Sequence, residues 1–391
     1  MLEGMRIVDL TTVVFGPYAT QSLANLGADV IKVETPQGDV TRWAGRPGKT
    51  PGMGPNHISF NRGKRSIILN LKEEADRHVM RELIATADVF VHNVRGDAIK
   101  RLGFDYERVR ELKRDLIYVH CVGFGSNGPY APLQAYDDLI QAASGTATLA
   151  SRVDGNPRPR YIPSLIADKV AGLYGANAIL AAIVHKLRTG NGQFVEVPMF
   201  EVFTHFMLIE QLFGAVFDRP GAKAGYPRQL DPGRQPFLTK DGWISIVAYT
   251  DDSLCHLLKL LGRSEVLTEE RFATVQARLK RDATTRLYEI INEATPEFTT
   301  QALIDLCRKS KPEIPAMAVR DLQDVLTDPH LLEAGFFKRE DHPTEGPIFS
   351  MMPPVRFNVE TPPLRPAPLL GQHSQEIRQE LTPAAAPTPA G

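Results

Sequence analysis

The 391-residue sequence has few cysteines, no strong excess of either charge and no metal-ligand spacing. Its three cysteines are odd in number and far apart, which argues against a disulfide framework. A net charge of −1 provides neither a basic surface for nucleic acid nor an acidic tail. The ten histidines are scattered and no His-Glu-x-x-His occurs, so we expect no metal site.

Long apolar runs are also lacking. The longest, Val170–Val184, contains Asn177 and is shorter than the ~20 residues that a membrane-spanning helix needs. The opening residues Met1–Arg6 do not have the pattern of a signal peptide. We therefore expect a cytoplasmic protein that associates with neither membrane nor nucleic acid.

Alternating strands and helices fill the first third of the chain. The length favours two domains, and 43% apolar with 23% charged residues is typical of globular proteins. Repeated strand–helix units predict a large doubly wound α/β domain with a parallel sheet, whose ligands bind beyond the carboxyl ends of the strands. The expected strands are Ile7–Leu10, Asp29–Glu34, Ser66–Leu71, Val89–His92, Leu116–Val122 and Gln193–Val197.

Composition sets the expected domain boundaries. Residues 1–217 form the large domain, and 218–236, rich in proline, glycine and arginine, form a linker. Residues 237–329 form a smaller α+β domain, and 330–381 form a C-terminal return to the large domain. The tail 382–391 contains only Thr, Pro, Ala and Gly, and we expect it to be disordered.

The most distinctive stretch is a helix between Leu165 and Gly192 with Asp168 near its start. Apolar and small residues occupy nearly every position from 170 to 184, which predicts a buried helix without a solvated face. Gly190 stands where a left-handed C-terminal cap is expected. The residues alone favour Asp168 as the N-terminal cap, and the alternative is a carboxylate nucleophile.

Other candidate sites are weaker. Glu34 at the end of the second strand is typical of dinucleotide binding, but the first turn, Thr11–Pro17, lacks the spaced glycines. Ser126 is out of frame for a hydrolase nucleophile elbow, which favours a flexible loop. A basic cluster near two strand ends is either a solvated rim or a phosphate cradle. It consists of Lys64, Arg65, Lys72, Arg95, Lys100 and Arg101.

Several stretches in register carry a family resemblance across nearly the whole chain. They are Leu2–Leu10, Gly16-Pro17, Leu26–Glu34, Asn61–Ile67, Arg101–Phe104, Leu165–Gly175, Thr189–Gln193 and Ala367–His373. Together they resemble the class III CoA-transferases, also called the CaiB/BaiF family, with its formyl-CoA transferase and carnitine CoA-transferase relatives. The fold implied is a large Rossmann-like domain plus a smaller domain, assembled as a homodimer of two interlocked rings.

The resemblance also implies a chemistry. In this family an aspartate at the position of Asp168 attacks the acyl-CoA thioester, and the CoA thiolate then returns to give an aspartyl-CoA thioester. Tyr136 and Asp137 match residues that border this nucleophile. Coenzyme A is a substrate here, with no permanently bound cofactor implied. The residues matching the family's CoA contacts are Thr12, Val13, Thr35, Leu69, Lys72, Asn93, Val94, Arg101 and Leu102.

The sequence departs from formyl-CoA transferase at several of these positions. Val14 replaces a glutamine of the substrate pocket, Thr35 replaces an arginine, and Gln134 replaces a lysine. The segment Asp231–Gln235 lies where that enzyme has a glycine-rich loop. We expect CoA binding to survive these changes and oxalate specificity to be lost.

These observations favour an enzyme that moves CoA from an acyl-CoA to a free carboxylic acid. Arg228 and Arg234 in the linker could meet a second carboxylate, which suits succinyl-CoA as the donor. One alternative is an α-methylacyl-CoA racemase, which needs an acid and a base on opposite faces of the substrate. Racemase relatives carry a histidine where this chain has Tyr136. Another alternative is a non-catalytic acyl-CoA-binding protein.

Overall fold

The computed structural model describes residues 1–46, 48–278, 280–359 and 363–382, and these fall into two units. Unit 1 comprises residues 1–147, 161–209 and the C-terminal stretch from 335, and unit 2 comprises residues 148–160 and 210–334. The boundary of unit 1 differs from that of the predicted large domain, 1–217, because residues 148–160 and 210–217 belong to unit 2. Apart from Thr382, the tail predicted to be disordered lies outside the described residues.

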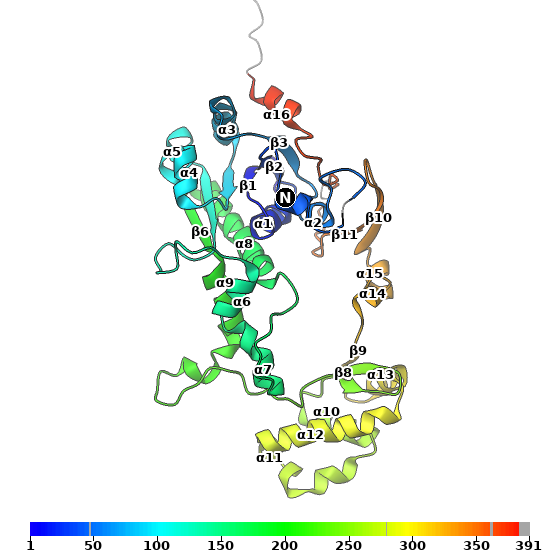
Figure 1. The fold of residues 1–391 in the computed structure, drawn as a ribbon. Helices are drawn as coiled ribbons and strands as arrows, with labels where there is room; N and C mark the ends of the chain where they lie inside the picture. Colours follow the sequence, from blue (N-terminus) through cyan, green and yellow to red (C-terminus); the bar gives the residue numbers. More distant parts are fainter. Residues whose placement is uncertain (47, 279, 360–362, 383–391) are drawn as a thin grey trace, which may run out of the picture. The chain divides into compact units, whose positions relative to one another are not determined.

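A six-stranded sheet forms the centre of unit 1, in the order β3-β2-β1-β4-β5-β6 (Figure 1). All neighbouring strands are parallel, which confirms the predicted α/β class. The strand order changes direction between β1 and β4, and such a switch point is where open α/β sheets bind ligands. The strands are β1 Arg6–Leu10, β2 Asp29–Glu34, β3 Arg65–Ile68, β4 Val89–His92, β5 Ile117–Val122 and β6 Phe194–Pro198.

Helices cover both faces of this sheet. Ile7 belongs to the apolar cluster shared with α1 and α8, whereas the next residue, Val8, belongs to the cluster with α3, α4, α5 and α16. Successive side chains of a strand point to opposite faces, so both faces are buried. The helices are α1 Phe15–Ala24, α2 Pro55–Phe60, α3 Glu74–Thr86, α4 Gly96–Leu102, α5 Tyr106–Leu112, α6 Asp137–Ala143, α8 Ile166–Thr189, α9 Met199–Gln211 and α16 Ser374–Leu381.

Helix α8 has one buried face and one exposed face. A side-chain carbon added at Gly172 would lie 3.0 Å from the Phe15 carbonyl oxygen, so small residues bring α8 close to α1. Leu173, Val184 and Leu187 are on the outer face and are 52%, 52% and 67% exposed. The prediction of a helix without an exposed face is therefore wrong for this chain alone. The predicted left-handed cap at Gly190 is confirmed, with φ of 75°.

Helix α8 also bears on the membrane prediction. By length and composition, it is the one helix in the described part of the chain that could cross a membrane. At 24 residues it is longer than the apolar run in the sequence, because polar residues continue the helix at both ends. Its buried face belongs to the core of unit 1.

The C-terminal segment returns to the outer strand of the sheet. The backbone N–H of His373 donates to the Ser66 carbonyl oxygen at 2.9 Å, and the Ile68 N–H donates to Ser374 Oγ at 3.1 Å. Arg65 forms ion pairs with Glu376 and with Glu380 of α16. These contacts cover the open edge of β3, where unpaired backbone groups would otherwise remain. An antiparallel hairpin, β10 Phe337–His342 and β11 Gly346–Met351, comes before this segment.

Unit 2 is a smaller mixed unit. Its antiparallel sheet has the order β7-β8-β9, and an apolar core joins it to α10, α12 and α13. A 3-10 turn, Glu270–Phe272, comes before α11. The elements are β7 Phe237–Leu238, β8 Trp243–Ile246, β9 Ala316–Ala318, α7 Leu149–Asp154, α10 Asp251–Leu260, α11 Val275–Arg278, α12 Arg281–Ala294, α13 Thr300–Lys309, α14 Leu322–Val325 and α15 Pro329–Glu333.

Candidate active site

Asp168 is the third residue of α8 and is buried, with 8% of its surface exposed. It is not the N-terminal cap, because it lies inside the first turn of α8 and Leu165 holds the cap position. The Asp168 backbone N–H donates instead to Asp137 Oδ1 at 3.1 Å. Asp137 therefore satisfies a free amide of the first turn of α8, and the Asp168 carboxylate is left available for chemistry.

Two buried carboxyl groups lie close together here. Burial raises the pKa of the Asp168 carboxyl from 3.8 to about 7, the charge of Asp137 adds to the rise, and the backbone amide of Phe15 opposes it. The Gln141 side-chain amide donates to Asp137 Oδ2 at 2.7 Å. Near neutral pH, Asp168 thus changes its protonation state in a water-poor site, a property typical of functional carboxylates.

The other predicted neighbours of Asp168 differ in exposure. Tyr136 immediately precedes α6 and is 62% exposed. Val14 immediately precedes α1 and is buried. The sequence did not predict Gln141, although its position four residues after Asp137 on a helix is a recognisable signal. It also did not predict the Phe15 amide, and a backbone group has no sequence signature.

A cavity of about 290 Å³ opens at the carboxyl ends of β1, β2, β3 and β4. Its position matches the switch point of the sheet. Of the nine residues predicted to contact CoA, Val13 and Arg101 are not part of the lining. The other seven line the cavity: Thr12, Thr35, Leu69, Lys72, Asn93, Val94 and Leu102. Glu34 and Asp39 also line it, and neither was predicted to do so.

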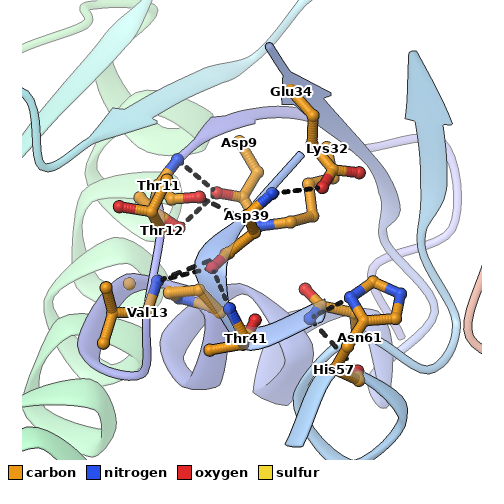
Figure 2. A network of polar contacts seen from close by, with 12 residues as sticks. Asp9, Thr11, Thr12, Val13, Lys32, Glu34, Asp39, Thr41, His57 and Asn61 are labelled. Atoms are coloured by element: carbon orange, nitrogen blue, oxygen red, sulfur yellow. Dashed lines mark hydrogen bonds and ion pairs between the residues drawn. The ribbon is translucent and has the colours of Figure 1, made fainter. Parts of the chain in front are cut away.

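Beside this cavity lies a network of buried charges (Figure 2). Lys64 Nζ is 3.0 Å from Asp9 Oδ2, and Lys32 Nζ is 3.0 Å from Asp39 Oδ2. Burial opposes the charge on Asp9, but Lys64 and Lys32 hold the pKa of its carboxyl at about 2. Lys64 is fully buried, so it forms neither a solvated rim nor a phosphate cradle.

Two further sequence interpretations are settled by side-chain partners. Glu34 accepts hydrogen bonds from Arg42 Nε at 2.7 Å and from Ser66 Oγ at 2.8 Å. Its carboxylate is therefore not free to hold a ribose as a dinucleotide site requires. Arg65 is bound to Asp29 and to the carboxylates of α16 and is likewise not a phosphate ligand. Lys72 is the one member of the basic cluster that lines the cavity.

The loop between β1 and α1 extends from this cavity to the nucleophile. The Thr12 N–H donates to Asn93 Oδ1 at 3.1 Å, and Asn93 Nδ2 donates to the Thr12 carbonyl oxygen at 3.0 Å. Three residues later, the backbone of Phe15 approaches α8 at Gly172, and its amide lowers the pKa of the Asp168 carboxyl. One short segment therefore contacts both the predicted CoA site and the predicted nucleophile.

Unit 2 contains a separate cavity of about 510 Å³. Arg228 lines it, with its guanidinium 4.4 Å from the centre of the Tyr249 ring. Arg234 donates to Gln229 Oε1 at 2.7 Å. Asp231, at the start of the segment in place of the glycine-rich loop, accepts from the Gly233 N–H at 2.8 Å. That these arginines meet a second carboxylate stays a prediction.

Metal ligands do not gather in the part of the chain that the structure describes. No group of three or more His, Cys, Asp or Glu side chains there is arranged to hold a metal ion.

Comparison with known proteins places these features in context. The sequence matches the family model of CoA-transferase family III over residues 2–374. It is 32% identical to the succinate–glutarate CoA-transferase of Agrobacterium fabrum, over 97% of this chain and 95% of that protein. It is 31% identical to the human succinyl-CoA:glutarate CoA-transferase, over 97% of this chain and 86% of that protein. A CaiB/BaiF family protein from Brucella suis has a similar crystal structure, with a TM-score of 0.82, 31% identity and coverage of 97% and 99%.

Proposed function

The chain belongs to CoA-transferase family III, and from this premise we propose that it transfers CoA from succinyl-CoA to a free carboxylic acid through a thioester on Asp168. The observation that carries the proposal is a buried carboxyl, Asp168, on a helix that packs closely against Phe15 of α1, while Thr12, three residues before Phe15, lines a cavity with six other predicted CoA contacts. Two relatives named for succinate or succinyl-CoA and glutarate support a dicarboxylic donor and acceptor.

The proposed reaction exchanges acyl groups without any net change of protons or electrons. An Asp168 oxygen attacks the thioester carbon, the C–S bond breaks, and the CoA thiolate departs. The product on the enzyme is a mixed anhydride of Asp168 and succinate. The thiolate then attacks the Asp168 carbonyl carbon, and succinate departs from an aspartyl-CoA thioester. The acceptor carboxylate attacks this thioester and expels the thiolate. The thiolate attacks the acceptor's acyl carbon, which gives the new acyl-CoA and frees Asp168.

The surroundings of Asp168 suit these steps. The backbone amide of Phe15 lowers the pKa of the Asp168 carboxyl, and in this proposal it donates to the oxyanion that forms when the thiolate attacks. Burial keeps water from the anhydride and the thioester, both of which hydrolyse readily. The cavity at the strand ends supplies apolar walls from Leu69, Val94 and Leu102, and Lys72 supplies a positive charge for a phosphate.

A homodimer of interlocked chains is part of the same proposal. The outer face of α8 carries exposed leucine and valine side chains, and Ile209 of α9 is 72% exposed. Tyr174 on α8 is hydrogen-bonded to His205 on α9 at 3.1 Å, so the two outer faces adjoin. An apolar surface of this kind is typical of subunit interfaces.

Trapping the covalent intermediate tests the proposed function. The protein is incubated with succinyl-CoA alone, and its peptides are examined by mass spectrometry for a CoA adduct on Asp168. Asp168→Ala should abolish the adduct and lower exchange at least about a thousandfold. Asp138→Ala, an exposed residue of α6, is the matched control and should leave both unchanged.

Three outcomes would contradict the proposal. Normal exchange by Asp168→Ala would remove the nucleophile. Tight CoA binding without any exchange by the native chain would favour a non-catalytic binding protein. Deuterium incorporation at the α-carbon of a 2-methylacyl-CoA, without CoA transfer, would instead favour the racemase alternative.

A further inference from the structure

Val13 has an unusual backbone conformation. Its φ of 72° lies in the left-handed region, which β-branched residues rarely adopt. It is one of two non-glycine residues with positive φ in the described part of the chain. Val13 lies between Thr12, which lines the cavity, and the start of α1, where Phe15 approaches the helix that carries Asp168. Strain of this kind persists only where the surroundings fix it.

Asp39 is the residue that fixes this conformation. Both of its carboxylate oxygens accept the Val13 N–H, each at 3.2 Å (Figure 2). Oδ1 also accepts the Thr41 N–H at 3.0 Å, and Oδ2 also accepts Lys32 Nζ at 3.0 Å. Asp39 is buried, so the hydrogen bonds to Val13 do not compete with bulk water.

Two other buried charged residues, Lys32 and Asp9, also bind the backbone of the loop between β1 and α1. Lys32 Nζ donates to the Thr11 carbonyl oxygen at 2.9 Å, and Asp9 Oδ1 accepts the Thr11 N–H at 2.9 Å. A buried ion pair is weak evidence for stability, because an apolar pair of similar volume often serves folding as well. Here the charged groups bind the backbone of two residues of the same loop, Thr11 and Val13, which indicates a role in placing that loop.

We propose that Asp39 is a positioning residue for the transfer reaction, which clamps Val13 so that the Phe15 N–H is directed at the Asp168 carboxylate. This inference rests on the proposed function. Asp39 lines the cavity, but its carboxylate oxygens are bound to Val13, Thr41 and Lys32. It acts through the loop Thr11–Phe15, and its loss lets Val13 relax toward negative φ and turns the Phe15 amide away.

The clamp predicts a specific kinetic pattern. Asp39→Asn replaces one acceptor oxygen with an NH₂ group that faces other donors, and kcat for CoA exchange should fall about 10- to 100-fold through misplacement. Thr12 is held separately by Asn93, so KM for succinyl-CoA should change by less than about threefold. A loss confined to KM would overturn the inference.

A double-substitution experiment separates positioning from general stability. Glycine adopts positive φ without strain, so the Val13→Gly chain depends less on the clamp. Asp39→Asn should therefore lower kcat less in the Val13→Gly background than in the native background. An equal fold-loss in both backgrounds would overturn the inference, because it would mean that Asp39 does not act through Val13.

Hydrogen exchange tests the clamp without relying on activity. In Asp39→Asn, the amides of the segment 11–16 should exchange at least about tenfold faster, because the loop opens more often. The control is Glu340→Gln, which breaks the Arg62–Glu340 ion pair of 2.6 Å outside this loop and should leave these amides and kcat unchanged. Unchanged exchange in folded Asp39→Asn would overturn the inference.

Failure of the proposed function can be distinguished from failure of the inference about Asp39. Absence of CoA exchange by the native chain contradicts the proposed function, while the amide measurement still decides the clamp. Should Asp39→Asn not fold, Asp39→Glu keeps the charge but moves both oxygens by one methylene. It should also lower kcat and speed the loop amides, and native values for both would overturn the inference.

Discussion

Asp168 is influenced at once by burial, a second carboxylate and one backbone amide. The first two raise the pKa of its carboxyl, and the third lowers it. A raised pKa makes the carboxylate more basic and so a better nucleophile when deprotonated, but it reduces the deprotonated fraction at neutral pH. The native state also binds this proton more tightly than the unfolded chain, so deprotonating Asp168 as the pH rises through about 7 works against folding.

The pH dependence of exchange follows from this balance. The attacking form is the carboxylate, so kcat/KM should rise with pH with a midpoint near 7. Asp137→Asn removes the charge beside Asp168 and leaves its burial, so the midpoint should move to lower pH. The measurement is initial exchange rate against pH at low succinyl-CoA. Asp138→Asn is the control, and a native midpoint near 4 would contradict the assignment.

At the scale of single residues, the sequence identified the groups that carry a motif and missed those that act through the backbone. Asp168 and Asp137 came from the family resemblance, and the structure brings them together. The residues alone suggested a cap at Asp168, because the true partner of the helix amide, Asp137, lies 31 positions earlier in the chain. Asp39 reads as an ordinary turn residue, and nothing in the sequence indicates that it binds the Val13 amide.

Strands and helices were predictable from the sequence where their apolar residues repeat with one clear spacing. The strands of the sheet were found to within three residues, and the largest difference is at β3, which ends at Ile68, where Leu69, Asn70 and Leu71 line the cavity. Helix α8 shows the limit of periodicity. A helix that is apolar on all sides is assigned to the interior, but sequence does not say whether its second face meets the same chain or another.

The loops at the carboxyl ends of the strands should determine the affinity for CoA thioesters. Lys72 follows β3 and lines the cavity, and its ammonium group is the positive charge that we assign to a CoA phosphate. Lys72→Ala should raise KM for succinyl-CoA about tenfold and leave kcat nearly unchanged, because the contact is the same in the ground and transition states.

A matched variant controls for net charge. Arg95 follows β4, is exposed and does not line the cavity, so Arg95→Ala should leave KM unchanged. The effect of Lys72→Ala should also shrink at high ionic strength, where the native KM rises toward that of the variant. Equal KM values for the two variants would contradict the assignment of Lys72.

In the whole molecule, the return of the C-terminal stretch to unit 1 bears on how two copies of the chain can associate. The chain leaves unit 1 after residue 209 and re-enters it at 335, and the C-terminal helix is then tied to β3. Arg65 pairs with Glu376 and Glu380, more than 300 residues away in sequence. These contacts close the chain into a loop that is held by non-covalent bonds. A closed loop is the topological condition for two copies to be threaded through one another.

Interlocking makes a prediction that an ordinary dimer does not share. The native protein should have twice the 43.3 kDa chain mass in solution at all dilutions where it stays folded. Two differently tagged dimers, once mixed, should form no mixed dimer under native conditions, because a subunit is released only if the C-terminal stretch detaches from unit 1, which breaks the contacts of Arg65 with α16 among others. Mixed dimers should appear after unfolding and refolding together.

Arg65→Ala should accelerate native exchange of subunits, whereas Arg263→Ala, which removes an exposed ion pair with Glu297, should not. Rapid mixing of native dimers would show that the chains pack side by side, and the exposed face of α8 would then account for the association alone.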